Sequence, residues 1–244
     1  MNLQAITDQL INALAPLHFG PPVTHVYNPL VYARSAYDQY LSRFGQSPKE
    51  VVLVGMNPGP WGMSQTGIPF GNVESVTDWL KIQAPIGKPR KMHPKRMVTG
   101  FDCPRQEVSG RRVWGWAQDT FGTPEHFFRR FFIANYCPLA FIEKSGRNRT
   151  PNKLPVSERA PLLAACDQAL LETIKTLSPR YVIGIGAFAA DRIKKVCSQL
   201  NPGKNRGSDR ILGRITHPSP ANPLANRGWA KMIHSELKEI GIQI

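Results

Sequence analysis

Hydrophobic and polar positions follow two patterns along the chain, and each pattern predicts a different element. Continuous apolar runs closed by glycine or proline are typical of the buried strands of a parallel sheet. Four such runs occur, at residues 49–55, 131–138, 180–186 and 210–218. Apolar residues spaced three and four positions apart predict helices. The helical pattern covers residues 4–14, 31–44, 73–83, 112–121, 158–176, 187–200 and 225–240.

This alternation of strand and helix predicts one α/β domain over residues 1–244, a parallel sheet with helices on both faces. A chain of 244 residues, 41% of them hydrophobic, is long enough to bury such a core. Ligands of these sheets bind beyond the carboxyl ends of the strands. The loops that follow the four apolar runs are therefore the expected place for a site.

The loop after the first run, residues 56–71, has four glycines, three prolines and no charged residue. It contains neither the lysine of a phosphate-binding loop nor the G-x-G-x-x-G of a dinucleotide fold. A neutral, planar ligand fits it better. Gly59 allows close backbone approach, Asn57 offers a carboxamide, and Phe70 offers a flat face for stacking. Turn formation and core packing are the alternative roles of these three residues.

The loop after the last run is centred on His217. Pro218 and Pro220 make its backbone rigid, so the imidazole is aimed in one direction. Capping or packing is the alternative role of a single histidine at a strand end. A helix is predicted to begin at Asn222 and Pro223. The polar neighbours of His217 are of types that contact phosphates, namely Ser219, Asn222, Asn226 and Arg227.

The charge of the chain narrows the class of partner. A net charge of +14 and a pI near 10.0 predict a polyanionic partner, because clustered Lys and Arg displace counterions from phosphates. Nucleic acid is favoured, although membrane surfaces and ribosomes are also polyanions. Basic side chains concentrate in residues 87–96, 145–159 and 201–210. Each segment either contacts DNA or is a solvated face.

Membrane and metal roles are disfavoured. No apolar run approaches the roughly 20 residues that span a bilayer, and the N-terminus lacks the charged head and apolar block of a signal peptide. A soluble, unexported protein is expected. The four cysteines form no C-x-x-C pair, and their spacing suits neither zinc nor an iron–sulfur cluster. Reduced thiols, no metal and no other cofactor are expected.

Two segments resemble the signature motifs of the single-strand-selective monofunctional uracil-DNA glycosylases. They are GMNPGPWGMSQTGIPFG at residues 55–71 and HPSPANPLANRGW at residues 217–229, and NYCPLAF and SGRNRTP between them are also similar to the family. The matching segments span roughly two-thirds of the chain in the family's order. The resemblance implies a three-layer α/β/α fold with a four-stranded sheet. It also implies excision of uracil flipped out of single- or double-stranded DNA, without a metal.

Five residues receive roles from this resemblance, position by position. Asn57 is similar to the residue that positions the attacking water and supports the cationic sugar. His217 is similar to the histidine that donates a hydrogen bond to uracil O2. The backbone of Met56 contacts the base, Phe70 stacks on it, and Asn135 reads its Watson–Crick edge.

The chemistry of the residues agrees with these roles. Glycosidic cleavage builds negative charge on the leaving base, which a preorganised neutral histidine donor stabilises. An amide at Asn135 can pair with O4 and N3–H of uracil, whereas cytosine presents the reversed pattern. Because no carboxylate lies between Glu50 and Glu74, we expect no general base from the first loop and a modest turnover. Gly59 stands where uracil-strict relatives have a tyrosine against C5, so we expect the pocket to admit 5-hydroxymethyluracil as well.

Two segments supply the candidates for DNA contact. Residues 145–159 resemble a DNA-contacting insertion of the family, with Ser145, Arg147, Asn148, Arg149 and Lys153 as candidates. The loop after His217 adds Ser219, Pro220, Ala221, Asn222, Pro223, Leu224 and Arg227. Vertebrate relatives place a duplex-wedging arginine where this chain has Ala221. We therefore expect Asn222, Leu224 or Arg227 to share the wedge role.

Two other functions stay open at this point. One is a glycosylase of the same superfamily that prefers hypoxanthine, xanthine or a mismatched base. The other is a catalytically silent, basic nucleic-acid-binding module. The joint presence of Asn57, Asn135 and His217 favours an active enzyme of base-excision repair. We expect it to be a monomer, cytoplasmic if bacterial and nuclear if eukaryotic.

Overall fold

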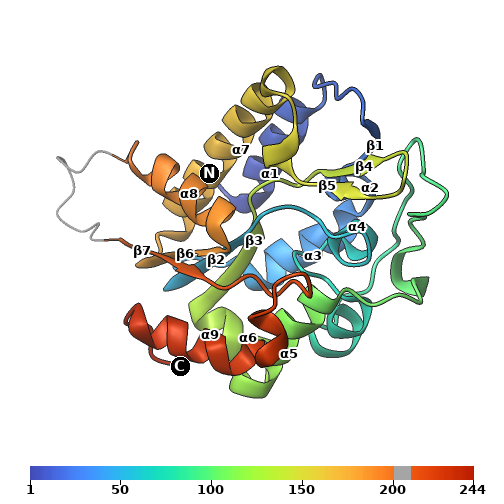
Figure 1. Ribbon diagram of the computed structural model, residues 1–244. Helices are drawn as coiled ribbons and strands as arrows, with labels where there is room; N and C mark the ends of the chain where they lie inside the picture. Colours follow the sequence, from blue (N-terminus) through green and yellow to red (C-terminus); the bar gives the residue numbers. More distant parts are fainter. Residues whose placement is uncertain (201–209) are drawn as a thin grey trace.

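The computed structural model describes residues 1–200 and 210–244, and a four-stranded parallel sheet forms its centre (Figure 1). In spatial order the strands are β3 (Phe131–Asn135), β2 (Val51–Gly55), β6 (Tyr181–Ile185) and β7 (Ile211–Ile215). Each lies within one of the apolar runs, so the predicted strands are confirmed. The strands are shorter than the runs, and in the runs at 131–138 and 210–218 the proline-containing ends turn into loops.

Helices cover both faces of the sheet (Figure 1). One face carries α1 (Leu3–Leu14), α7 (Val156–Leu177) and α8 (Ala187–Cys197). The other carries α5 (Val108–Phe121), α6 (Pro124–Arg130) and α9 (Trp229–Glu239). All residues of β2 and β6 are buried, as their continuous apolar sequences require. The predicted three-layer α/β/α class is confirmed.

The edge of the sheet at β3 is covered by α3 (Arg34–Phe44). The Tyr40 hydroxyl donates a hydrogen bond to the Ile133 carbonyl at 2.8 Å. The single helix predicted over residues 31–44 is wrong, because the backbone leaves the helical region at Ala33 (φ −111°, ψ 28°). A short helix, α2 (Pro29–Tyr32), precedes this break, and Ala33 itself is fully buried against Gly67.

Two other helix predictions are confirmed only in part, because each helix is shortened by a residue with left-handed backbone. The helix predicted over residues 73–83 is limited to residues 73–79, mostly the π-helical turn η1 (Ser75–Trp79), and Lys81 follows at φ 53°. The C-terminal helix begins at Trp229, after Gly228 at φ 113° and the 3-10 turn η4 (Ala225–Arg227). The helix start expected at Asn222 and Pro223 is therefore wrong. A side-chain pattern does not report these backbone reversals.

A second sheet was not expected. It is antiparallel, with the order β1 (Val23–Tyr27), β4 (Ala140–Glu143) and β5 (Asn148–Arg149). Its strands are too short for a clear alternation. The sheet holds residues 140–150 beside the loop that follows β3, close to the site described below. The remaining short elements are α4 (Met63–Thr66), η2 (Gly100–Asp102) and η3 (Pro151–Lys153).

No described helix combines the length and apolar character needed to cross a membrane. The basic segment at 201–210 lies outside the described residues except for Arg210.

Candidate functional site

A pocket of about 380 Å³ opens at the carboxyl ends of the parallel strands, a volume typical of sites for small ligands, roughly 300–1,000 Å³. It brings together all the side chains that the sequence assigned to catalysis and base binding, namely Met56, Asn57, Gly59, Phe70, Asn135 and His217. Other lining residues are Pro58, Pro60, Met63, Glu107, Ser109, Asn148, Thr150 and Ser219. The site therefore lies where the fold class places it.

The strand order explains why distant residues meet here. Asn57 follows β2, Asn135 ends β3, and His217 follows β7. Because β2 lies between β3 and the β6–β7 pair, Asn135 and His217 flank the loop after β2 from opposite sides. Backbone hydrogen bonds join the loops, with Tyr136 N–H donating to the Gly55 carbonyl and Cys137 N–H to the Met56 carbonyl, both at 2.9 Å.

Gly55 lets an aromatic ring and an amide lie directly on the end of β2. A Cβ at residue 55 would lie 2.6 Å from the Phe70 ring and would overlap Oδ1 of Asn135. Phe70 itself has φ 55°, a left-handed conformation that is uncommon for a residue with a side chain and often marks functional sites. Its ring centroid is 6.5 Å from that of His217. The ring therefore forms one wall of the pocket.

Asn135 presents an unsatisfied acceptor. Its Nδ2 donates to Sδ of Met63 at 3.1 Å, whereas its Oδ1 is buried and has no hydrogen-bond partner among the described residues. An unpaired buried polar atom costs about 1–3 kcal/mol. A ligand that brings an N–H group to Oδ1 removes this cost.

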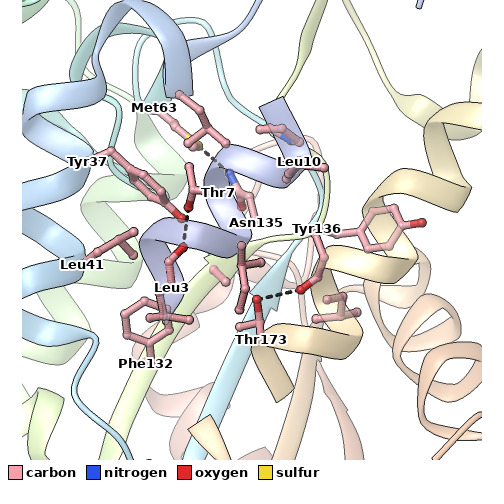
Figure 2. Close-up of a pocket in the computed structure, with 16 residues that line it drawn as sticks. Leu3, Thr7, Leu10, Tyr37, Leu41, Met63, Phe132, Asn135, Tyr136 and Thr173 are labelled. Carbon is pink, nitrogen blue, oxygen red and sulfur yellow. Dashed lines mark hydrogen bonds between the residues drawn. The ribbon is translucent and has the colours of Figure 1, made fainter. Parts of the chain in front are cut away.

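Asn135 is also supported from behind. A cavity of about 50 Å³ lies between α1, α3, β3 and α7, and Asn135 and Met63 line both this cavity and the main pocket. Figure 2 shows the amide directed at the Met63 sulfur, with Leu10, Leu41 and Phe132 among the surrounding side chains. The rear cavity is lined mostly by apolar side chains, and among the described lining residues only the Met63 sulfur hydrogen-bonds to the amide.

His217 presents a neutral donor. Its Nδ1 accepts the Ser219 N–H at 3.1 Å. A peptide N–H only donates, so the ring proton is assigned to Nε2. Burial lowers the pKa of His217 from its ordinary 6.5, which keeps the ring uncharged at neutral pH. The loop is tied down by Asn222, whose Nδ2 donates to the His217 carbonyl at 3.2 Å.

Asn57 is fixed less tightly. Its Nδ2 donates to the Leu139 carbonyl at 3.3 Å. In the described part of the chain its Oδ1 accepts no hydrogen bond, so this oxygen can accept one from a water molecule or a ligand.

Glu107 is a pocket residue that no sequence motif indicated. It precedes α5, and its Oε2 accepts the Trp61 N–H at 3.3 Å. Burial raises the pKa of its carboxyl group. The first loop indeed contains no carboxylate, but the fold brings one to it from a distant segment. Ser109 and Thr150 are further lining residues without a recognisable signal.

The candidates for DNA contact in residues 145–153 divide into two groups. Ser145, Arg147 and Lys153 are exposed. The other two are engaged within the protein. Asn148 donates to the Pro58 carbonyl at 2.9 Å and lines the pocket, and Arg149 forms a 2.7 Å ion pair with Glu143.

In the loop after β7, the exposed candidates are Pro220, Ala221, Pro223, Leu224 and Arg227. Leu224 is a large apolar side chain, 53% exposed, in this loop. Asn222 is half-buried and its Oδ1 accepts the Leu224 N–H at 3.2 Å, so both polar atoms of its side chain are used within the loop. Ser219 is half-buried and lines the pocket.

Comparison with known proteins shows the family of this chain. The family described as the uracil DNA glycosylase superfamily matches residues 42–235. The single-strand selective monofunctional uracil DNA glycosylase of Mus musculus is 44% identical over 229 residues, which cover 94% of this chain and 80% of the mouse protein. The corresponding protein of Bos taurus is 43% identical over 234 residues, 96% of this chain and 84% of the bovine protein.

Among solved structures, the crystal structure of wild-type Pedobacter heparinus SMUG2 matches with a TM-score of 0.60. The match covers 97% of this chain and 98% of that one at 17% identity, so it bears on the fold alone. The structural match supports the fold, and the sequence matches show the family. The chain belongs to the uracil DNA glycosylase superfamily and, within it, to the single-strand selective monofunctional glycosylases.

Proposed function

We propose that this protein is a monofunctional glycosylase of base-excision repair that hydrolyses the N-glycosidic bond of uracil in DNA and leaves an abasic site. The observation that carries the proposal is the convergence of Asn57, Asn135 and His217 beside the Phe70 ring in one pocket. The named relatives are uracil DNA glycosylases that are 43% and 44% identical to this chain over the aligned residues.

Base recognition follows from the unpaired atoms. A uracil flipped out of the strand stacks on Phe70, and its N3–H donates to Oδ1 of Asn135, which has no partner in the described part of the chain. The second Nδ2 hydrogen of Asn135 donates to O4. Cytosine has an acceptor at N3 and an amino donor on C4. Its acceptor would face the Asn135 oxygen and its donor would face the Asn135 NH2, which would leave buried groups unpaired.

Bond cleavage relies on His217 and Asn57. Nε2–H of His217 donates to O2 of the base as negative charge develops there, and one preorganised donor of this kind is worth about 3 kcal/mol. A neutral imidazole is already in the required state, because burial holds down its pKa. Asn57 Oδ1 holds the attacking water and supports the cationic sugar.

Exposed residues hold the DNA. Arg147, Lys153 and Arg227 contact phosphates, and Leu224 enters the base stack because Ala221 is too short to do so. A monomer suffices for this proposal, since every residue to which it assigns a role belongs to one chain. Single- and double-stranded DNA are both substrates, in the cytoplasm of a bacterium or the nucleus of a eukaryote.

The test is excision from oligonucleotides with one uracil, 5-hydroxymethyluracil, xanthine, hypoxanthine or thymine, in single- and double-stranded form. After incubation, alkali cleaves any abasic site. We expect alkali-dependent cleavage at uracil. Intact uracil substrates would refute the proposal, cleavage only at hypoxanthine or xanthine would shift the substrate class, and scission without alkali would contradict the monofunctional assignment.

Two variants test the roles within the pocket. His217→Ala and Asn57→Ala are each expected to lower single-turnover uracil excision by about 100-fold or more, with DNA affinity nearly retained. Gel-shift titration and single-turnover kinetics separate the two effects. The matched control is His234→Ala, an exposed histidine on α9 that contacts Thr120. A His217 or Asn57 variant as fast as this control would remove that residue from the mechanism.

A further inference from the structure

The space that glycine leaves at residue 59 is not empty. A Cβ on Gly59 would overlap Oε2 of Glu107 and lie 2.7 Å from its Cδ and 3.1 Å from Oε1. The Glu107 carboxyl group therefore occupies the position where the first atom of a larger residue 59 would stand. The pocket is wider here than with a bulky residue 59, but its wall at this point is a carboxyl group.

Glu107 is held in this position by its neighbours. Its backbone N–H donates to Oδ1 of Asn72 at 3.2 Å, and its Cγ packs against the backbone of Gly62. Its Oε2 accepts the Trp61 N–H at 3.3 Å. Among residues 1–200 and 210–244 it forms no ion pair. A carboxylate has about four acceptor sites, so hydrogen-bonding capacity remains for a group inside the pocket.

The base orientation of the proposed function brings C5 to this wall, and the inference rests on that function. In uracil the order around the ring is O2, N3, O4 and C5. With O2 at His217 and with N3–H and O4 at Asn135, C5 lies beyond Asn135 on the side away from His217. Asn135 contacts Met63, which directly follows Gly62 beneath the Glu107 side chain. The Glu107 wall therefore borders the pocket on the C5 side.

A pocket open at C5 has a discrimination problem. Thymine carries a methyl group at C5 and is a normal DNA base, whereas 5-hydroxymethyluracil differs from it by one hydroxyl group. Apolar walls separate such a pair poorly, but a site that hydrogen-bonds the hydroxyl strongly rejects the analogue without it. A buried carboxylate facing a methyl group loses water and gains no partner.

We propose that Glu107 is a specificity residue that reads the C5 substituent of the base, by accepting a hydrogen bond from a hydroxymethyl group and rejecting a methyl group. Uracil itself leaves room for a water molecule on the carboxylate, so uracil and 5-hydroxymethyluracil are accommodated and thymine is excluded. The raised pKa of Glu107, caused by burial, agrees with a carboxyl group that benefits from an added donor.

The test pairs substrate and enzyme changes in a cycle. Single-stranded oligonucleotides carry 5-hydroxymethyluracil or its isostere 5-ethyluracil, and the enzymes are the unaltered protein, Glu107→Gln and Glu107→Met. We expect kcat/KM of the unaltered protein to favour the hydroxymethyl base by about tenfold or more. The ratio should collapse toward unity in Glu107→Met, with Glu107→Gln intermediate. Substituent effects on the leaving group cancel in the comparison between enzymes.

The control is Glu74→Gln, an exposed carboxylate that interacts with Gln106, and it should keep the ratio of the unaltered protein. Equal kcat/KM values for the two bases in the unaltered protein would overturn the inference, whether or not any variant folds. So would an undiminished preference in Glu107→Met. Uracil excision by the unaltered protein is measured in the same experiment. If uracil is not excised, the proposed function is refuted. If uracil is excised but kcat/KM is equal for 5-hydroxymethyluracil and 5-ethyluracil, only the role of Glu107 is refuted.

Discussion

Asn135 and His217 each present one hydrogen-bonding atom to the pocket, an acceptor in Asn135 and a donor in His217. In His217 the backbone of Ser219 occupies Nδ1 and thereby sets the proton on Nε2. In Asn135 a sulfur atom holds the NH2 group, while the oxygen has no hydrogen-bond partner within residues 1–200 and 210–244. The pocket thus offers a donor and an acceptor whose orientations are set before any base arrives, as efficient electrostatic stabilisation requires.

The hydrogen bond at Nδ1 of His217 predicts a pH dependence. Protonation would put an N–H on Nδ1 against the Ser219 N–H, so the charged ring loses that contact. The folded-state pKa lies below 6.5; hence the neutral form persists above this value and is lost as pH falls. Single-turnover uracil excision should be flat at neutral pH and fall along an acid limb below it.

Measurement between about pH 4.5 and pH 8.5 covers this range. The acid limb should be absent from the residual activity of His217→Ala. An inflection above pH 6.5 in the unaltered protein, or a rate that rises on acidification, would contradict the neutral-donor role.

At the level of elements, α5 supports the loop that follows β7. Arg112 of α5 donates from Nη1 to the Pro218 carbonyl and from Nη2 to Oδ1 of Asn226, both at 2.8 Å. These bonds bracket the exposed part of the loop and lie next to His217. Arg112 is therefore a positioning residue, although it touches no base.

Arg112→Met should remove both hydrogen bonds and loosen the loop. Hydrogen bonds from a charged donor are worth about 1.5–3 kcal/mol, so we expect excision to slow by about tenfold or more. A looser loop exposes His217 to water, and the acid limb should move toward pH 6.5, a change that simple loss of stability does not produce. Arg112→Lys should recover part of the rate.

The matched control is Arg111→Met, because Arg111 is exposed on the same helix and bonds only to Gln106 among the described side chains. If Arg112→Met has the rate and pH profile of Arg111→Met, the loop does not depend on α5.

Elements differ in how far the sequence predicted them. The parallel strands were predictable because burial on both faces demands uninterrupted apolar runs. The breaks at Ala33 and Gly228 were missed because backbone reversals depend on tertiary packing rather than on side-chain spacing. Asn57 and His217 could be found from the sequence because each follows a recognisable strand. Glu107 could not, because it stands before a helix and reaches the pocket only through the packing of α5 on the first loop.

For the molecule as a whole, the excess of positive charge predicts DNA binding that weakens with salt. Arg147→Gln, Lys153→Gln and Arg227→Gln should each weaken binding similarly for uracil-containing and undamaged strands. Each should also reduce the slope of log K against log salt by about one. Fluorescence anisotropy over a series of salt concentrations measures both quantities.

Lys175→Gln is the control for this series. Lys175 lies in the last turn of α7, which leads to the amino end of β6 and thus away from the pocket, and it pairs with Glu172. If Lys175→Gln weakened DNA binding as much as Arg147→Gln, DNA affinity would depend on the total charge of the protein rather than on specific phosphate contacts beside the pocket.

The strand order fixes the distance between the two strand ends from which the base is read. Asn135 ends β3 and His217 follows β7 by two residues, and β3 and β7 are the outermost strands of the parallel sheet. The backbones of these two strands are three intervals of about 4.8 Å, or about 14 Å, apart. This span is set by interstrand hydrogen bonds, which side-chain substitutions leave in place. Side-chain substitutions can therefore alter which substituents and edges of a base are read, whereas the distance between the two strand ends from which the base is read is a property of the backbone lattice itself.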